Sequence, residues 1–96
     1  MSKLRSEGMD FFFNTVLQLE NIDECYAFFE DICTIKELQS IAQRVVVAKM
    51  LKEGRVYSEI VDKTGASTAT ISRVNRSLSY GNDGYDMVFK RLEDKK

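Results

Sequence analysis

The feature that most constrains the fold of this chain is a glycine that separates two short apolar helical patterns within residues 56–80. On each side of it, apolar residues recur at the spacing of one helical face. The residues on these faces are Val56, Ile60, Val61 and Thr64 before the glycine, and Ile71, Val74 and Leu78 after it. Two short helices with a tight turn between them predict a helix-turn-helix over 56–80.

Three residues form the predicted turn. Gly65 is expected to end the first helix, because the left-handed backbone conformation costs little only for glycine. Ala66 is small enough to let the two helices pack closely. Ser67 can accept the backbone N–H hydrogen bonds that open the second helix, which is predicted over 67–79.

The outward face of the second predicted helix carries small, hydroxylated or basic side chains and no acid. Hydroxyls reach phosphate oxygens, alanine fits against a thymine methyl, and arginine forks onto guanine. The predicted DNA-binding residues are Ser67, Thr68, Ala69, Thr70, Ser72, Arg73 and Arg76. This pattern indicates a helix that binds the major groove of double-stranded DNA. The alternative is a helical protein-interaction adapter that keeps the hairpin only for packing.

Charge is unevenly distributed along the chain, although the net charge is only −1. Residues 1–33 hold two basic and seven acidic side chains, whereas residues 34–80 hold eight basic and four acidic ones. The basic segment is the one that contains the hairpin. Because local potential governs the attraction of phosphates, this distribution agrees with DNA binding.

The composition favours an all-α fold with about six helices, since the chain has no proline and is 44% hydrophobic. We expect a flexible N-terminus at 1–8 and one helical domain at 9–96. The sequence contains no run of about 18 apolar residues, the length that a membrane-spanning helix needs. The N-terminus has no apolar signal region, so a cytoplasmic protein is expected.

The sequence predicts neither an enzyme nor a metal site. It has no histidine, no glycine-rich phosphate loop and no pair of carboxylates within an apolar stretch. Cys25 and Cys33 would lie roughly 12 Å apart along one helix, which is too far for a disulfide bond. We therefore expect both to be buried structural thiols.

Two aromatic helical patterns at 9–19 and 24–33 hold every phenylalanine except Phe89. A monomer of 96 residues does not easily hide so many apolar side chains. We therefore predict a homodimer in which these helices pack across the twofold axis. The alternative is a monomer with an unusually aromatic core.

The longest predicted helix spans 35–52, opens with a capping box of Thr34 and Glu37, and ends at Gly54. Its inward residues are predicted to be Ile35, Leu38, Ile41, Ala42, Val45 and Leu51. A last helix is predicted over 85–92, after a loop with two glycines.

The order of these parts resembles the Trp-repressor superfamily, and most of all its TrpR-like YerC/YecD-type branch from Gram-positive bacteria. The resemblance covers roughly 34–92. It rests on the helix that runs from Thr34 and contains Gln43-Arg44-Val45, and on the segment GASTATISRVNRSL at 65–78. The segment 69–73 and Asn75 are its specific part.

The resemblance implies an intertwined all-helical homodimer that represses transcription at palindromic operators. Each subunit would place the helix at 67–79 into the major groove, and the two helices would lie roughly 34 Å apart. It also implies a site for an amino-acid corepressor. The matching effector-binding positions are Thr34, Arg44, Arg73 and Ser77.

The sequence departs from the family pattern at two places. Val74 stands where the family's tryptophan sensor has a glycine against the indole, and Ser58-Glu59 stand where that sensor has an arginine on DNA. Three alternatives stay open for the effector: an indole-sized ligand, a smaller amino acid such as histidine, or no effector with Val74 filling the cleft. Histidine is favoured over tryptophan.

Overall fold

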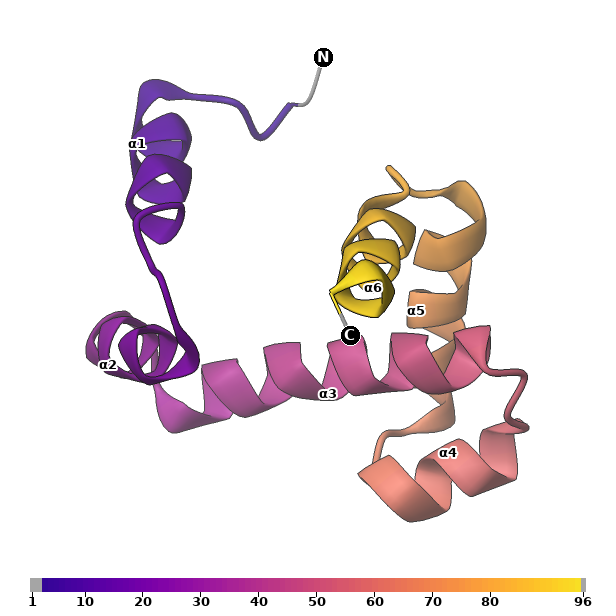
Figure 1. Cartoon of the computed structure of the whole chain (residues 1–96). Coiled ribbons are helices and arrows are strands. Elements are labelled where there is room, and N and C mark those ends of the chain that lie inside the picture. The colour runs from indigo at the N-terminus through magenta and orange to yellow at the C-terminus, as the bar shows by residue number, and fades with distance from the viewer. Residues whose placement is uncertain (1–2, 96) are drawn as a thin grey trace. The chain divides into compact units, whose positions relative to one another are not determined.

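The described part of the chain, residues 3–95 of a computed structural model, consists of helices joined by short turns and contains no strand (Figure 1). Its helices are α1 (Glu7–Val16), α2 (Ile22–Ile32), α3 (Ile35–Lys52), α4 (Tyr57–Thr64), α5 (Thr68–Tyr80) and α6 (Gly84–Asp94). This confirms the predicted all-α class with six helices. The bounds of α3 are the predicted ones, and the other helices differ from prediction only near their ends.

The predicted domain at 9–96 divides into two compact units. Unit 1 is Met1–Ile35 and unit 2 is Lys36–Lys96. Unit 1 therefore holds α1 and α2, and unit 2 holds α3 from its second residue onward, together with α4 to α6. Each unit is described by itself below.

The N-terminal helix of unit 1 begins earlier than predicted. Of the expected flexible segment 1–8, residues 1–2 lie outside the described part, and Glu7 and Gly8 belong to α1. The Ser6 hydroxyl accepts the Met9 backbone N–H at 3.1 Å and so caps the helix. This cap was not predicted from the sequence. In the same way, the Asn21 side chain accepts the Glu24 N–H at 2.9 Å and opens α2.

Neither helix of unit 1 has a fully buried residue. Phe11 and Leu17 of α1 are 72% and 76% exposed, and Ile22 and Tyr26 of α2 are 72% and 65% exposed. Cys25 is also exposed and Cys33 is partly exposed, and both thiols are free. The prediction of buried thiols is therefore wrong for Cys25, which lies on a helix without a buried residue.

Unit 2 contains the hydrophobic core. The buried residues of this core are Val47, Ala48, Met50, Ile60, Ala66, Ile71, Val74 and Phe89. They come from the C-terminal half of α3, from α4 and α5 with the turn between them, and from α6, and these elements gather at one end of α3 (Figure 1). Each fully buried Ile or Val side chain stabilises such a core by about 1.5–3 kcal/mol.

The predicted inward face of α3 is wrong for its N-terminal half. Ile35, Ile41 and Val45 are exposed, and of the predicted set only Leu51 packs against the core. The prediction placed one inward face along all 18 residues of α3, whereas the core uses a different face, that of Val47 and Met50. The apolar stripe of the N-terminal half therefore lies open in the isolated chain.

Candidate nucleic-acid interface

The first helix of the hairpin, α4, ends at a left-handed glycine as predicted. Gly65 has φ 72° and ψ 5°, and its N–H donates to the Val61 carbonyl at 2.9 Å. Only glycine adopts this conformation at low cost, so the residue fixes the point at which the chain leaves α4.

Side chains of the turn hold the next residues in place. The Thr64 hydroxyl donates to the Ile60 carbonyl at 2.7 Å and accepts the Ala66 N–H at 3.1 Å. Ala66 is only 2% exposed, because its methyl group lies within the core of unit 2. The turn is therefore anchored by hydrogen bonds on one side and by packing on the other.

Ser67 caps α5, which begins at Thr68. Its hydroxyl oxygen accepts the Thr70 N–H at 3.1 Å, and the hydroxyl donates to Thr70 Oγ1, also at 3.1 Å. The predicted cap is confirmed. Thr70, which we predicted to contact DNA, is half-buried and shares its hydroxyl with the cap. In the structure, Thr70 therefore stabilises the first turn of α5 through its hydrogen bonds with Ser67.

The inner face of α5 holds the helix against the core. Ile71 and Val74 are buried, and Leu78 is partly buried and packs against the same cluster. Val74 is 2% exposed, so its side chain is enclosed within unit 2. The predicted spacing of the apolar stripe is confirmed.

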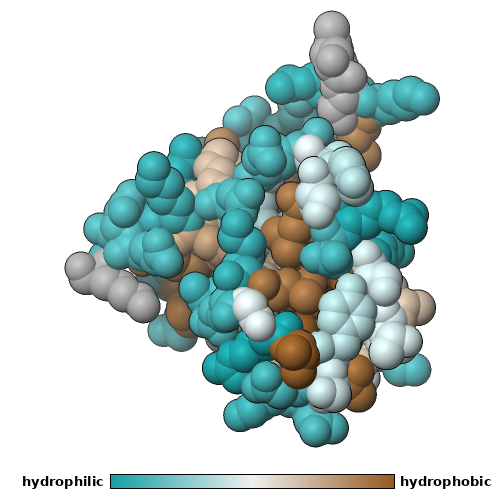
Figure 2. All heavy atoms as spheres, turned by 90° about the vertical axis from the view of Figure 1, so that its right-hand side faces the viewer, coloured by the Kyte–Doolittle hydropathy of each residue, from teal (hydrophilic) through white to brown (hydrophobic). Residues whose placement is uncertain are grey.

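The outer face of α5 is open to solvent. Ser67, Thr68, Ala69, Ser72, Arg73 and Arg76 are all exposed. Within residues 3–95, neither Arg73 nor Arg76 forms an ion pair or a side-chain hydrogen bond. In Figure 2, which looks toward the side of unit 2 that carries the hairpin, hydrophilic (teal) and weakly polar (white) residues surround a smaller apolar (brown) area. Two unpaired positive charges on a polar face are well suited to phosphate and base edges.

Charge at the start of α4 is largely paired. Arg55 Nη1 lies 3.2 Å from Glu59 Oε2, and Arg55 Nε lies 3.8 Å from Glu53 Oε1. These side chains are about half exposed, so the pairs contribute little to stability. The positive potential of the hairpin therefore comes from α5 more than from α4.

A hydrogen bond that the sequence pattern did not indicate joins α3 to the hairpin. The Gln43 side-chain amide donates from Nε2 to the Thr64 carbonyl at 3.1 Å. The partners are 21 residues apart in sequence, and no local pattern connects them. The family resemblance included Gln43, but it gave no role for the residue.

The predicted effector residues are distributed over both units. Thr34 belongs to unit 1, and the other three belong to unit 2, where Arg44 is half-buried and Arg73 and Ser77 are exposed. Arg44 lines a shallow hollow of about 400 Å³. That hollow is formed by α3 residues and not by Arg73 or Ser77. The effector site stays a prediction.

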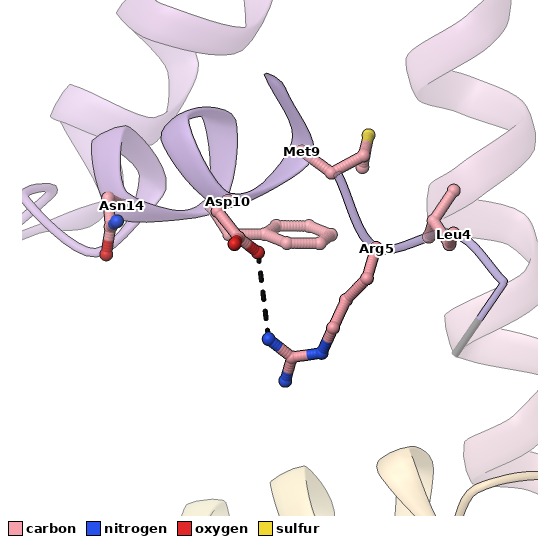
Figure 3. A pocket seen from close by; sticks show the side chains of 6 residues that line it. Leu4, Arg5, Met9, Asp10 and Asn14 are labelled. Carbon is pink, nitrogen blue, oxygen red and sulfur yellow. Dashed lines mark ion pairs between the residues drawn. The ribbon is translucent and has the colours of Figure 1, made fainter. Parts of the chain in front are cut away.

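Two other hollows contain none of the predicted site residues. One, of about 470 Å³ in unit 1, is lined by Leu4, Arg5, Met9, Asp10, Phe13 and Asn14, and its Arg5–Asp10 pair is 3.8 Å long (Figure 3). The other, between α3 and α6, has the Lys52–Asp86 pair at 2.7 Å and mixed charge. Among residues 3–95, no group of three or more potential metal ligands occurs.

Comparison with known proteins identifies close relatives. The family model described as Trp repressor protein matches residues 7–93. YerC, an uncharacterized protein of Bacillus subtilis (strain 168), is 54% identical over 94 residues, which cover 98% of this chain and 90% of YerC. No helix in the described part of the chain has the length and apolar character needed to span a membrane.

Two solved structures agree with the fold. The crystal structure of a TrpR-like protein from Eubacterium eligens ATCC 27750 has a TM-score of 0.92 and 60% sequence identity, over 95% of this chain and 94% of that one. A crystal structure from Staphylococcus aureus has a TM-score of 0.92 and 54% identity, over 95% of this chain and 91% of that one. At this similarity the helices and the hairpin are shared.

Proposed function

Because this chain belongs to the Trp repressor protein family, a family of DNA-binding regulators, we propose that it is a dimeric, sequence-specific transcriptional repressor. The observation that carries the proposal is the outer face of α5, which is polar, free of acid and equipped with two unpaired arginines. The same helix is held from behind by Ile71 and Val74. A rigid helix with an exposed basic face is what major-groove recognition requires.

We expect different residues along α5 to contact different parts of the DNA. Ser67 and Thr68 at the N-terminus of the helix suit phosphate oxygens, since helix N-termini attract anions. Ala69 and Ser72, one turn further, are small enough to approach base edges, and Arg73 can fork onto a guanine. Arg76, near the end of the face, suits a phosphate.

A second copy of the chain is the partner that the open apolar surface supports. The exposed side chains of α1 and α2 and the apolar stripe of α3 are large and numerous for one chain. Large exposed apolar side chains within one helix usually mark an interface. Two copies related by a twofold axis would also present two α5 helices to a palindromic operator.

The amino-acid corepressor is the finer part of the proposal. Arg44 and Arg73 offer guanidinium groups for a carboxylate, and Thr34 and Ser77 offer hydroxyls. The preference for histidine over tryptophan rests on the sequence alone, in which Val74 stands where the family's tryptophan sensor has a glycine; in the structure this side chain is enclosed in the core of unit 2. Such a repressor works in the cytoplasm, where bacterial DNA lies.

The decisive experiment for DNA binding is selection of bound sequences from random double-stranded DNA, with and without added amino acids. We expect enrichment of a palindrome with half-sites about one helical turn apart. The matched control carries Thr68→Glu and Ser72→Glu, which place negative charge on the outer face and should remove binding. A wild-type protein without affinity for DNA at low salt would contradict the proposal and favour a protein-interaction adapter.

Thermal unfolding with a panel of amino acids tests the corepressor. A ligand that binds only the folded state raises the melting temperature, by an amount that grows with its concentration. We expect histidine to raise it more than tryptophan. The control variant Arg44→Ala should lose the effect. A panel without any shift would exclude the corepressor and leave the DNA-binding proposal intact.

A further inference from the structure

The hydrogen bond from Gln43 to Thr64 ties the hairpin to the longest helix. Gln43 lies in α3, Thr64 is the last residue of α4, and both are partly buried. The amide nitrogen of Gln43 and the backbone oxygen of Thr64 are 3.1 Å apart, within the usual range for an N–H donor and a carbonyl acceptor.

This contact satisfies a group that a helix end leaves without a partner. The last carbonyls of an α-helix have no N–H donor within the helix. At the end of α4, the Gly65 N–H serves the Val61 carbonyl, and the Gln43 amide serves that of Thr64. A side chain of α3 therefore contributes to the cap of α4, in addition to the apolar packing between them.

The hydrogen bonds continue from Thr64 into the turn. The Thr64 hydroxyl accepts the Ala66 N–H at 3.1 Å, and the next residue, Ser67, caps α5. A connected set of hydrogen bonds thus leads from Gln43 through Thr64 to Ala66, which directly precedes the cap residue Ser67. Loss of the Gln43 amide would remove the hydrogen bond between α3 and this end of the set and leave only the apolar packing.

We infer that Gln43 is a positioning residue for DNA reading: it fixes the turn between α4 and α5 relative to α3, so that α5 meets the groove at one angle. This inference rests on the proposed function. Phosphate contacts tolerate a small change in angle, whereas base-edge contacts need close geometry. Gln43 should therefore affect specific binding more than non-specific binding.

The test uses Gln43→Met, which keeps the length of the side chain and removes the donor, and Gln43→Glu, which places a carboxylate against the Thr64 carbonyl. The matched control is Gln39→Met, one turn earlier on α3 at an exposed position. Hydrogen exchange of the Ala66 amide reports on the turn without DNA. Dissociation constants for the selected operator and for random DNA measure how far binding depends on DNA sequence.

We expect both Gln43 variants to exchange the Ala66 amide several-fold faster than the wild type. Affinity for the operator should fall about tenfold, and affinity for random DNA should stay within about twofold. The control should match the wild type in all three measurements. If Gln43→Met fails to fold, Gln43→Glu supplies the same comparison, and thermal unfolding identifies which variants are folded.

Two outcomes would overturn the inference without affecting the proposed function. One is unchanged protection of the Ala66 amide in both variants, and the other is an equal loss of affinity for operator and random DNA. Absence of DNA binding by the wild type would instead overturn the proposed function and, with it, any role of Gln43 in reading. Because exchange is measured without DNA, these two failures are distinguishable.

Discussion

At the scale of single residues, the arginines of α5 differ in what they can contribute. Arg73 lies next to Ser72, which we propose approaches base edges, whereas Arg76 lies nearly one turn further along the helix. Both are exposed and without an ion pair in the described part of the chain, so their charges make no ionic contact that stabilises the fold there. Their substitution should therefore change binding and leave stability almost unchanged.

Arg76→Ala should weaken binding to every DNA sequence to a similar degree. A phosphate contact carries no sequence information, and its loss lowers the slope of log affinity against log salt by about 1. Titrations at several salt concentrations, with operator and random DNA, measure both effects. Arg91→Ala, in α6, is the control with the same loss of charge. A loss confined to the operator would instead identify Arg76 as a base contact.

Ser67→Ala should lower the stability of the folded chain. The substitution removes the cap from the Thr70 N–H and costs about 1 kcal/mol. For a domain of this size, the melting temperature should fall by about 4–8 °C. Thermal unfolding followed by circular dichroism measures the change, with Ser79→Ala as the exposed control. An unchanged melting temperature would show that the cap does not stabilise α5.

The glycines that border the helices are expected to differ in what a methyl group would cost. At Gly81, which follows α5, an added Cβ would lie 2.4 Å from the Ser77 carbonyl oxygen, so the backbone must shift. At Gly65 a Cβ would meet nothing within 4 Å, but φ is +72°. The first case is a steric clash and the second is conformational strain of about 1–2 kcal/mol.

Gly81→Ala should therefore destabilise the chain more than Gly65→Ala does. Gly84→Ala is the matched control, since a Cβ there meets nothing within 4 Å and its φ is not positive. Chemical denaturation of the three variants gives the free energies of unfolding. A smaller loss for Gly81→Ala than for Gly65→Ala would contradict the steric argument.

At the scale of elements, features that depend on neighbouring residues were predicted correctly, whereas the helix faces that other elements bury were not. The Gly65 turn, the Ser67 cap and the apolar stripe of α5 depend on residues close in sequence, and all three were predicted. The buried face of α3 depends on which elements cover it, so a period of 3.6 residues could not distinguish its two apolar faces. The same reason explains the exposed Cys25.

The candidate site shows the same division. The outward residues of α5 could be predicted because the apolar stripe fixes which side faces out. The contact between Gln43 and Thr64 could not, because it joins residues far apart along the chain. Thr70 is partly buried and its hydroxyl accepts a hydrogen bond from Ser67, and the sequence pattern did not indicate either feature.

At the scale of the whole molecule, the open stripe on α3 predicts self-association. Val45→Glu should convert a dimer into monomers, because a charge in an apolar interface is costly to desolvate. Sedimentation velocity measures the change in mass. Ser40→Glu, on another face of the same helix, is the control and should stay dimeric. A wild-type protein that sediments as a monomer would contradict the proposed assembly.

The exposed residues on the outer face of α5 make few contacts that stabilise the fold. Thr68, Ala69, Ser72, Arg73 and Arg76 make no side-chain hydrogen bond or ion pair with other described residues. Their identities can consequently change during evolution at little thermodynamic cost, unlike Ser67, which the helix needs. Under the proposed function, the choice of DNA target could therefore change through these residues while the scaffold stays the same.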